Sequence, residues 1–236
     1  MDQLSLDVQL PDQAEFSNFV AGRNRETLDA LMAHCSAMTD PVFWLHGPAA
    51  VGKTHLLVAA CHQVTRDGGK AAFFAASRAA DLSAEDIDSW ADKDFVAIDD
   101  VDALAGLAGW ERALFNLFNA LRDNGSVMLV SAAASPRETD FQLQDLASRM
   151  TSGLVYRIRP LTDEERIEAL QVRAQKRGFE LPDETSRYLI YRCPRDLSSL
   201  FAVLDRLDAA SLREQRRVTV PFVKRVLGLA SDNIDD

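Results

Sequence analysis

Apolar residues follow two different spacings along this chain. Short continuous apolar runs, typical of buried strands, fall at residues 42–45, 71–75, 94–100, 127–131 and 154–158. Between these runs the apolar residues recur at helical spacing, which predicts helices over 25–38, from the end of a glycine-containing loop to about 65, and over 111–122. Alternating strands and helices predict an α/β fold: a parallel sheet covered by helices on both faces, with a ligand at the carboxyl ends of the strands.

The strand pattern disappears from Pro160 onward. Thr162 and Glu165 have the spacing of a capping box at a helix start. Helices are predicted from there to about 177 and over 183–192, 195–215 and 221–229. The pattern therefore predicts an extended leader over 1–15, an α/β domain over 16–159 and a small all-helical domain over 160–236. The acidic residues 231–236 are expected to form a frayed tail.

The run GPAAVGKT joins the first strand to the helix after it and matches the phosphate-loop pattern G-x-x-x-x-G-K-S/T. Glycines let backbone N–H groups turn toward phosphates, the lysine places its charge on the outer phosphates, and the threonine offers a hydroxyl to Mg²⁺. The segment expected to contact ADP or ATP consists of Gly47, Pro48, Ala49, Ala50, Val51, Gly52, Lys53, Thr54 and His55. The chain is therefore predicted to bind a nucleotide with Mg²⁺.

Two carboxylates, Asp99 and Asp100, end the apolar run at 94–100. A nucleotide site of this type needs a carboxylate at a strand tip to hold Mg²⁺ and a neighbour to orient the attacking water. We assign Asp99 to the metal, together with Thr54, and Asp100 to the water. On their own, two acids after a strand also fit a solvated loop start.

Composition narrows the range of functions. The 236 residues carry 26 Lys and Arg against 36 Asp and Glu, a net charge of −10, which argues against autonomous nucleic-acid binding. The apolar runs are too short to span a membrane, so a cytoplasmic protein is expected. The cysteines at 35, 61 and 193 are odd in number and widely spaced, which favours buried thiols over disulfides or zinc.

Five segments together resemble the AAA+ nucleotide-binding module of the bacterial replication initiator DnaA. They are residues 18–24 (NFVAGRN), 98–101 (IDDV), 117–121 (LFNAL), 146–154 (LASRMTSGL) and 193–197 (CPRDL). The resemblance runs from about Phe16 to Leu229 and implies an AAA+ P-loop NTPase fold followed by a helical lid. DnaA proteins also carry a helix-turn-helix domain after the lid, so this chain is not expected to read origin DNA.

The resemblance also implies roles for individual residues. Val20, in the first of these segments, is expected to contact the nucleotide. Arg149, in the subunit-interface box, is expected to act as an arginine finger that reaches a site on another molecule. The alternative is a surface arginine paired with Asp145, one helical turn away. Arg195 in the lid is the expected second sensor, with Arg192 close enough to compete for that role and Asp196 as a simple ion-pair partner for either.

One position departs from the family pattern. The family places a polar first sensor at the end of the fourth strand, where this chain has Ala132, which cannot orient water. Only Ser131 is available as a substitute. Weak or no intrinsic ATP hydrolysis is therefore expected, which suits a protein that holds ADP as a structural ligand.

The leader contains QLSLDV at residues 3–8, which resembles the hexapeptide that docks bacterial proteins on the replicative sliding clamp. Such a segment binds extended, with a glutamine hydrogen bond at one end and apolar side chains in pockets. The contacts are expected from Gln3, Leu4, Ser5, Leu6 and Val8. The alternative is a first strand or a disordered tail.

These features resemble DnaA-related regulators that, on the clamp, stimulate ATP hydrolysis by DnaA and so inhibit replication initiation. The expected partners are the sliding clamp, DnaA and further copies of the chain, with no membrane partner. Two other functions stay open: an independent ATPase or helicase loader, and a nucleotide-gated clamp adaptor without catalytic effect.

Overall fold

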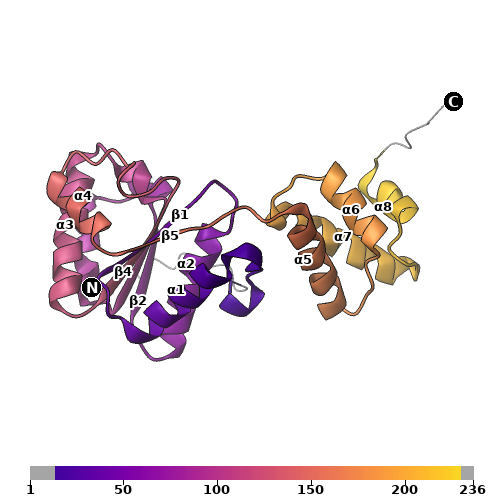
Figure 1. Cartoon of the computed structure of the whole chain (residues 1–236), viewed down its shortest axis with the longest axis horizontal. Coiled ribbons are helices and arrows are strands. Elements are labelled where there is room, and N and C mark those ends of the chain that lie inside the picture. Colours follow the sequence, from indigo (N-terminus) through magenta and orange to yellow (C-terminus); the bar gives the residue numbers. More distant parts are fainter. Residues whose placement is uncertain (1–13, 230–236) are drawn as a thin grey trace. The chain divides into compact units, whose positions relative to one another are not determined.

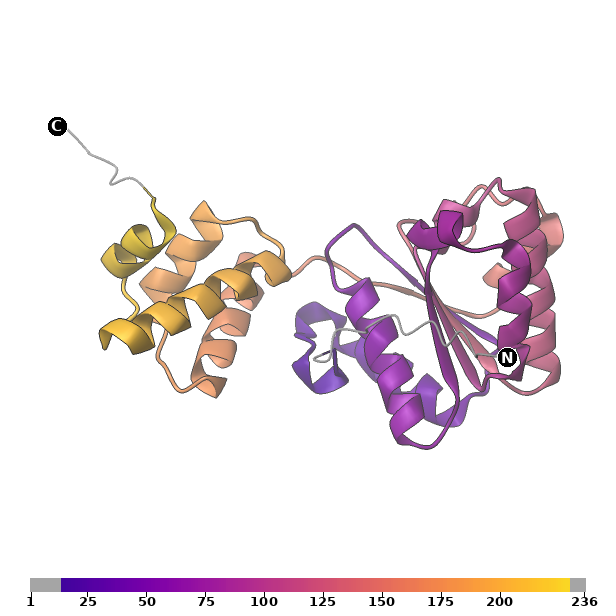
Figure 2. The same ribbon diagram turned by 180° about the vertical axis from the view of Figure 1, so that it is seen from behind.

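The computed structural model describes residues 14–229. Contacts divide the chain into two compact units, with the boundary between Arg159 and Pro160. Figures 1 and 2 show a sheet flanked by helices in the first unit and helices alone in the second.

The first unit contains a five-stranded parallel sheet in the order β2-β3-β4-β1-β5. Its strands are β1 (Val42–His46), β2 (Ala71–Ala75), β3 (Phe95–Asp99), β4 (Val127–Ala132) and β5 (Leu154–Arg157). Every residue of β3 and β4 is buried, and all but Asp99 and Ser131 are apolar, as expected for central parallel strands with helices on both faces. The predicted α/β class and the five strands are confirmed, with no strand end shifted by more than one residue.

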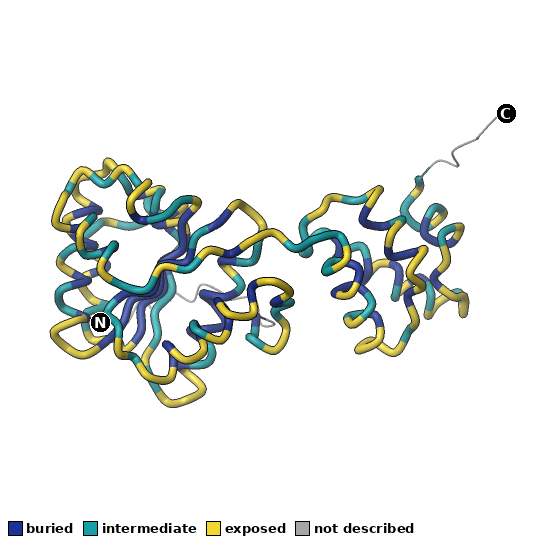
Figure 3. Tube along the Cα trace, viewed as in Figure 1, coloured by how far each residue is buried: buried dark blue, intermediate teal, exposed yellow. Residues whose placement is uncertain are grey.

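Helices cover both faces of this sheet (Figure 1). On one face lie α1 (Arg25–Ala37) and α2 (Lys53–Arg66), which pack against Phe43, Leu45 and Leu129. On the other face lie α3 (Ala108–Asp123) and α4 (Gln144–Thr151), which pack against Trp44 and Val130. Figure 3 shows the buried residues concentrated along the strands.

Several short elements were not anticipated from the sequence pattern. They are α4 and the 3-10 helices η1 (Phe16–Asn18), η2 (Gly22–Asn24), η3 (Ala76–Asp81), η4 (Ala84–Asp92) and η5 (Val101–Leu104). Each is too short to show several turns of apolar periodicity, which is the signal that identified the longer helices.

The second unit is a bundle of α5 (Asp163–Lys176), α6 (Asp183–Arg192), α7 (Leu197–Glu214) and α8 (Val220–Leu227). The capping box at the start of α5 is present: the Thr162 hydroxyl accepts from the Glu165 N–H, and the Glu165 carboxylate accepts from the Thr162 N–H. Leu170, Leu189 and Leu204 are fully buried in the core of the bundle. The predicted helical domain is confirmed, although α7 begins at Leu197 and leaves Arg195 outside the helix.

The three cysteines are free thiols. Cys35 and Cys61 are buried, and burial raises the pKa of each thiol to about 12. Cys193 is only partly buried, so the expectation of three buried thiols is right for two of them. Within residues 14–229, no helix is both long and apolar enough to span a bilayer.

Candidate functional site

The phosphate-loop segment connects the end of β1 at His46 to the start of α2 at Lys53. Ala50 and Gly52 take positive φ angles of 59° and 97°, in the left-handed region. Left-handed residues in such a loop turn successive backbone N–H groups toward the same side, which makes an anion-binding concavity. The N-terminus of α2 adds its positive dipole end to this concavity.

Two close approaches hold this loop in place. A Cβ atom at Gly52 would lie 2.8 Å from the Phe19 ring, and one at Gly47 would collide with the backbone carbonyl oxygen of Ile158. Glycine is therefore required at both positions by contact with neighbouring segments. The conformation of the loop therefore depends on its contacts with Phe19 and Ile158 as well as on its own sequence.

Lys53 lies almost fully buried at the base of the loop, with 7% of the residue exposed. Its Nζ donates to the carbonyl oxygens of Gly47, at 3.0 Å, and Pro48, at 3.2 Å. The same atom lies 3.9 Å from Oδ1 of Asp100. The ammonium group is thus directed back along the loop, where it can meet phosphate oxygens.

The acidic end of β3 lies beside this lysine. Thr54 Oγ1 donates to Asp99 Oδ2 at 2.6 Å, and Ser131 Oγ donates to Asp99 Oδ1 at 2.5 Å. Hydroxyl and carboxylate oxygens are the ligands that Mg²⁺ prefers. The donor set of Thr54 and Asp99 therefore fits a nucleotide-bound Mg²⁺, with Lys53 beside it for the phosphates.

Asp100 does not belong to the strand, although the sequence pattern extended the strand to it. Its φ of 52° turns the chain out of β3, and its side chain is 55% exposed. Partial burial and the neighbouring charge of Asp99 raise the pKa of Asp100, while Lys53 acts in the opposite direction. A carboxylate with a raised pKa at this edge has the chemistry of a proton-accepting group.

Ser131 has a different environment from that of a water-orienting residue. It is fully buried; its hydroxyl donates to Asp99 and accepts from the backbone N–H of Asp100 at 2.9 Å. Both bonds hold the acidic segment, so the hydroxyl is engaged beneath the site. Ala132 is also fully buried, and the nearby Ala133 N–H donates to Asp102 at 3.1 Å.

The segment at 18–24 contacts this loop and the end of the first unit. Phe19 lies against Gly52 and near the His55 ring, at 5.8 Å between ring centroids. The Asn24 side chain donates to the Arg159 carbonyl at 2.9 Å and accepts from the Arg159 N–H at 2.8 Å. His55 Nε2 lies 2.9 Å from the Glu15 carbonyl oxygen. Val20 is half-buried in the same segment, and its contact with a nucleotide stays a prediction.

Arg149 lies in the last turn of α4, on the sheet face opposite to α2. Its Cζ is 6.0 Å from the centre of the Phe118 ring in α3. It makes no ion pair with any residue between 14 and 229, Asp145 included. The structural alternative of an Arg149–Asp145 pair is therefore absent from this conformation.

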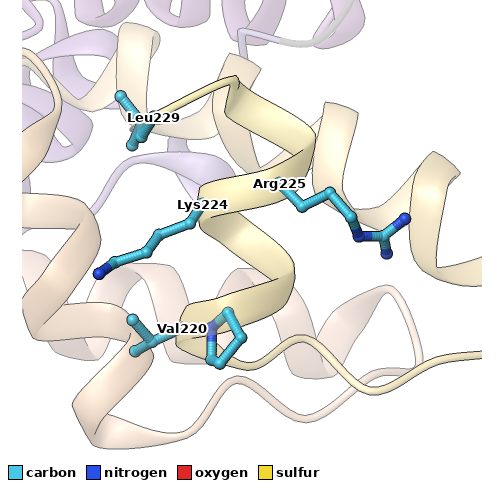
Figure 4. Close-up of a pocket in the computed structure, with 5 residues that line it drawn as sticks. Val220, Lys224, Arg225 and Leu229 are labelled. Carbon is cyan, nitrogen blue, oxygen red and sulfur yellow. The ribbon is translucent and has the colours of Figure 1, made fainter. Parts of the chain in front are cut away.

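The expected second-sensor residues lie in the second unit. Arg195 is exposed and precedes α7, where it forms no ion pair with the described residues. Asp196 instead caps α7 by accepting from the Ser199 N–H at 2.8 Å. Arg192 ends α6. The small pocket beside α8 in Figure 4 is lined by none of the predicted site residues.

The leader residues Gln3, Leu4, Ser5, Leu6 and Val8 lie outside the described residues, as does the acidic tail at 231–236. Clamp docking through residues 3–8 therefore stays a prediction from the sequence.

Comparison with known families identifies both units. A model of the bacterial DnaA ATPase domain matches residues 10–157, and a model of the Hda lid domain matches residues 163–227. The chain belongs to the bacterial DnaA ATPase-domain family. The two matches together make it an Hda- and DnaA-related AAA+ protein, with an AAA+ sheet domain followed by a helical lid.

Solved structures of DnaA and of a related motor share this fold. Domain III of the Thermotoga maritima replication initiation protein DnaA has 23% identity and a TM-score of 0.76, over 92% of this chain and 96% of that one. AMPPCP-bound DnaA from Aquifex aeolicus has 20% identity and a TM-score of 0.74, over 88% and 71%. The Thermotoga maritima RuvB Holliday junction branch migration motor has 17% identity and a TM-score of 0.65, over 89% and 70%.

Proposed function

We propose that this chain is a negative regulator of replication initiation that binds ADP or ATP, docks on the sliding clamp and stimulates ATP hydrolysis by DnaA. Membership of the DnaA ATPase family and the match to the Hda lid support the replication context. The AMPPCP bound to the Aquifex aeolicus relative supports an adenine nucleotide as the ligand of the phosphate loop.

The observation that carries the proposal is the environment of Arg149. The guanidinium has no carboxylate partner among residues 14–229, and its helix lies on the sheet face away from α2 and the phosphate loop. An arginine placed in this way is available to a nucleotide site on another molecule. In such a site it would stabilise charge on the phosphoryl group transferred from the partner's ATP.

The phosphate loop then has a binding role in the regulator itself. Lys53 and the loop N–H groups hold phosphates, and Thr54 with Asp99 holds the metal. Asp100, whose Oδ1 lies 3.9 Å from Lys53 Nζ, is the group that we propose to orient water. Ser131 is already bonded to Asp99 and Asp100, which supports weak intrinsic hydrolysis. Arg195 and Val20 are the further nucleotide contacts that we propose.

The function is tested by mixing the purified chain with clamp loaded on DNA and ATP-bound DnaA and measuring ADP formation. We expect DnaA to hydrolyse ATP faster only when chain and clamp are both present. Rapid hydrolysis by the chain alone would favour an independent ATPase. Clamp binding without faster hydrolysis by DnaA would favour a non-catalytic adaptor.

The docking part has its own variant. Changing Gln3, Leu4 and Leu6 together to Ala removes the hydrogen-bonding and apolar groups proposed to enter the clamp pocket. We expect clamp binding to disappear in surface plasmon resonance while ADP affinity stays at the parent value. Changing Asp7 and Gln9 to Ala is the matched control in the same segment. Clamp affinity equal to that of the parent in the triple variant would reject docking through residues 3–8.

A further inference from the structure

Glu111 is a buried carboxylate that the proposed site does not use. It is 1% exposed. Among residues 14–229, the buried Lys, Arg, Asp and Glu residues are Glu111, Lys53 and Asp99. Lys53 and Asp99 lie at the phosphate loop. Glu111 lies in the first turn of α3, on the other face of the sheet.

Three backbone N–H groups donate to this carboxylate. Oε1 accepts from Gly106 at 2.6 Å and from Gln142 at 3.0 Å, and Oε2 accepts from Leu143 at 2.7 Å. A buried carboxylate is tolerated only when such bonds replace its hydration. Two of the donors precede α4 directly, in a segment 31 and 32 residues away from Glu111. Glu111 therefore holds the chain where it enters α4.

Leu143 is the N-cap residue of α4, and no side chain caps this end. The helix has eight residues, which is shorter than helices that are stable through their own hydrogen bonds. Its position depends on the burial of Leu146 and Met150 and on the attachment at Leu143. The Glu111 bond fixes the end opposite to Arg149.

The Arg149 end of the helix contacts the same face of α3. Phe118, whose ring lies 6.0 Å from the Arg149 guanidinium carbon, is seven residues after Glu111. Seven residues are two helical turns, so Glu111 and Phe118 lie on one side of α3. We propose that Glu111 is a positioning residue for Arg149: it fixes the start of α4 so that the guanidinium at the other end is held ready for the partner's site.

This inference rests on the proposed arginine-finger function. A misplacement of about 1 Å at a catalytic group costs up to about 100-fold in rate. Glu111→Gln keeps the shape of the side chain, but its amide nitrogen cannot accept a hydrogen bond, so at least one of the three donors loses its acceptor. We expect DnaA stimulation to fall by roughly 10- to 100-fold, with ADP affinity within about twofold of the parent.

A double-mutant cycle separates positioning from general structural damage. In an Arg149→Ala background, Glu111→Gln should reduce the remaining stimulation by less than about twofold, because the group that it positions is gone. Equal losses in both backgrounds would overturn the inference. If Arg149→Ala itself stimulates like the parent, the proposed function fails instead, so the two failures are distinguishable.

Hydrogen exchange tests the same inference without activity. The amides of Gln142, Leu143 and α4 should exchange faster in Glu111→Gln, while those of β1 and β4 stay protected. Glu138→Gln is the matched control, since it removes a carboxylate from the same loop that accepts from Ser135 and not from α4. Unchanged exchange in α4 would overturn the proposal.

A second variant covers the case in which Glu111→Gln does not fold. Leu143→Pro removes the Leu143 N–H, at a residue whose φ of −81° is close to that of proline, and it also replaces a side chain that packs against the core. Leu143→Ala, which shortens the side chain but keeps the N–H, is therefore its control. Leu143→Pro should give the same loss of stimulation and the same faster exchange in α4. A folded Leu143→Pro chain that stimulates like the parent would overturn the proposal.

Discussion

The phosphate loop and the C-terminal end of α4 each carry a cationic side chain, and the two side chains have opposite environments. At the loop, the Lys53 ammonium donates to two carbonyl oxygens and lies near Asp100, and Asp99 accepts from two hydroxyls. At the end of α4, the Arg149 guanidinium has an aromatic ring nearby and no carboxylate partner among residues 14–229. The Lys53 ammonium thus has its hydrogen-bond acceptors within the chain, whereas the Arg149 guanidinium has no anionic partner among the described residues.

The difference follows from burial. A cation that is nearly fully buried needs acceptors in its own chain, because the cost of removing it from water is large. A half-buried guanidinium keeps part of its hydration, and contact with an aromatic ring contributes only about 0.5–1 kcal/mol at exposed sites. This difference matches the proposed function, in which the loop binds a ligand itself and Arg149 completes a site on a partner.

The most sensitive test of this comparison is Arg149→Ala. Stimulated hydrolysis by DnaA should fall by about 10³–10⁵-fold, because an arginine finger contributes that much to phosphoryl transfer. Arg149→Lys should recover little, since a point charge cannot replace the planar guanidinium. ADP formation in the reconstituted reaction measures both variants, with ADP affinity and clamp binding as controls. Stimulation equal to that of the parent would make Arg149 a structural residue.

Lys53→Ala tests the phosphate-loop half of the comparison. ADP should bind more weakly, because buried phosphates lose their nearest cation. Ligand at 100 times its dissociation constant stabilises a folded protein by about 2.7 kcal/mol, so saturating ADP should raise the melting temperature of the parent more than that of the variant. Differential scanning fluorimetry measures this shift, with the exposed Lys70→Ala as control. A parent chain that melts identically with and without ADP would contradict the loop assignment.

Ser131→Ala tests whether Ser131 supports the acidic edge, which is formed by Asp99 and Asp100 at the end of β3. The change leaves Asp99 Oδ1 without its donor and the Asp100 N–H without its acceptor. Leaving buried polar groups unpaired costs about 1–3 kcal/mol, which urea unfolding measures. Ser36→Ala, at an exposed position in α1, should cost less than about 0.5 kcal/mol. Equal unfolding midpoints for the two variants would show that Ser131 does not support the acidic edge.

The smallest expected effect concerns His34, whose two ring nitrogens are buried without hydrogen-bond partners. Burial lowers its pKa, although the charge of Asp40 acts against this. His34 therefore binds a proton more tightly in the unfolded chain than in the folded chain. Its contribution to folding stability is present above the unfolded pKa of about 6.5 and is lost as the pH falls below it. In His34→Leu, the free energy of unfolding measured with urea should fall less between pH 7 and pH 5 than it does in the parent. An unchanged pH dependence would assign the loss to other groups.

The three central strands, β1, β3 and β4, could be predicted because their apolar runs are continuous and buried on both faces. The edge strands β2 and β5 are less buried, but their short apolar runs were still recognisable. The helix α4 could not be predicted, since eight residues give too little periodicity, and Arg149 was identified only through a motif resemblance. Glu111 was interpreted as part of an amphipathic helix. Its burial depends on three backbone donors that lie elsewhere in the sequence, and no local pattern reports such convergence.

The acidic edge shows the same limit. Asp99 and Asp100 are adjacent in sequence, yet a left-handed φ at Asp100 separates a buried metal-site candidate from an exposed carboxylate. Ser131 was considered for orienting water. Its position between the two acids became apparent only from the neighbouring strand, because parallel pairing places the end of β4 beside that of β3.

The two hydrogen bonds between Asn24 and Arg159 have a mechanical consequence. They fix both backbone polar groups of the last residue before Pro160, so the chain up to Arg159 moves as part of the sheet domain. Proline restricts its own φ and the conformation of the residue before it. The segment at 18–24 that holds Arg159 also contacts the phosphate loop, through Phe19 and Gly52. Within the sheet domain, the last residue before Pro160 and the phosphate loop are therefore held by one short segment.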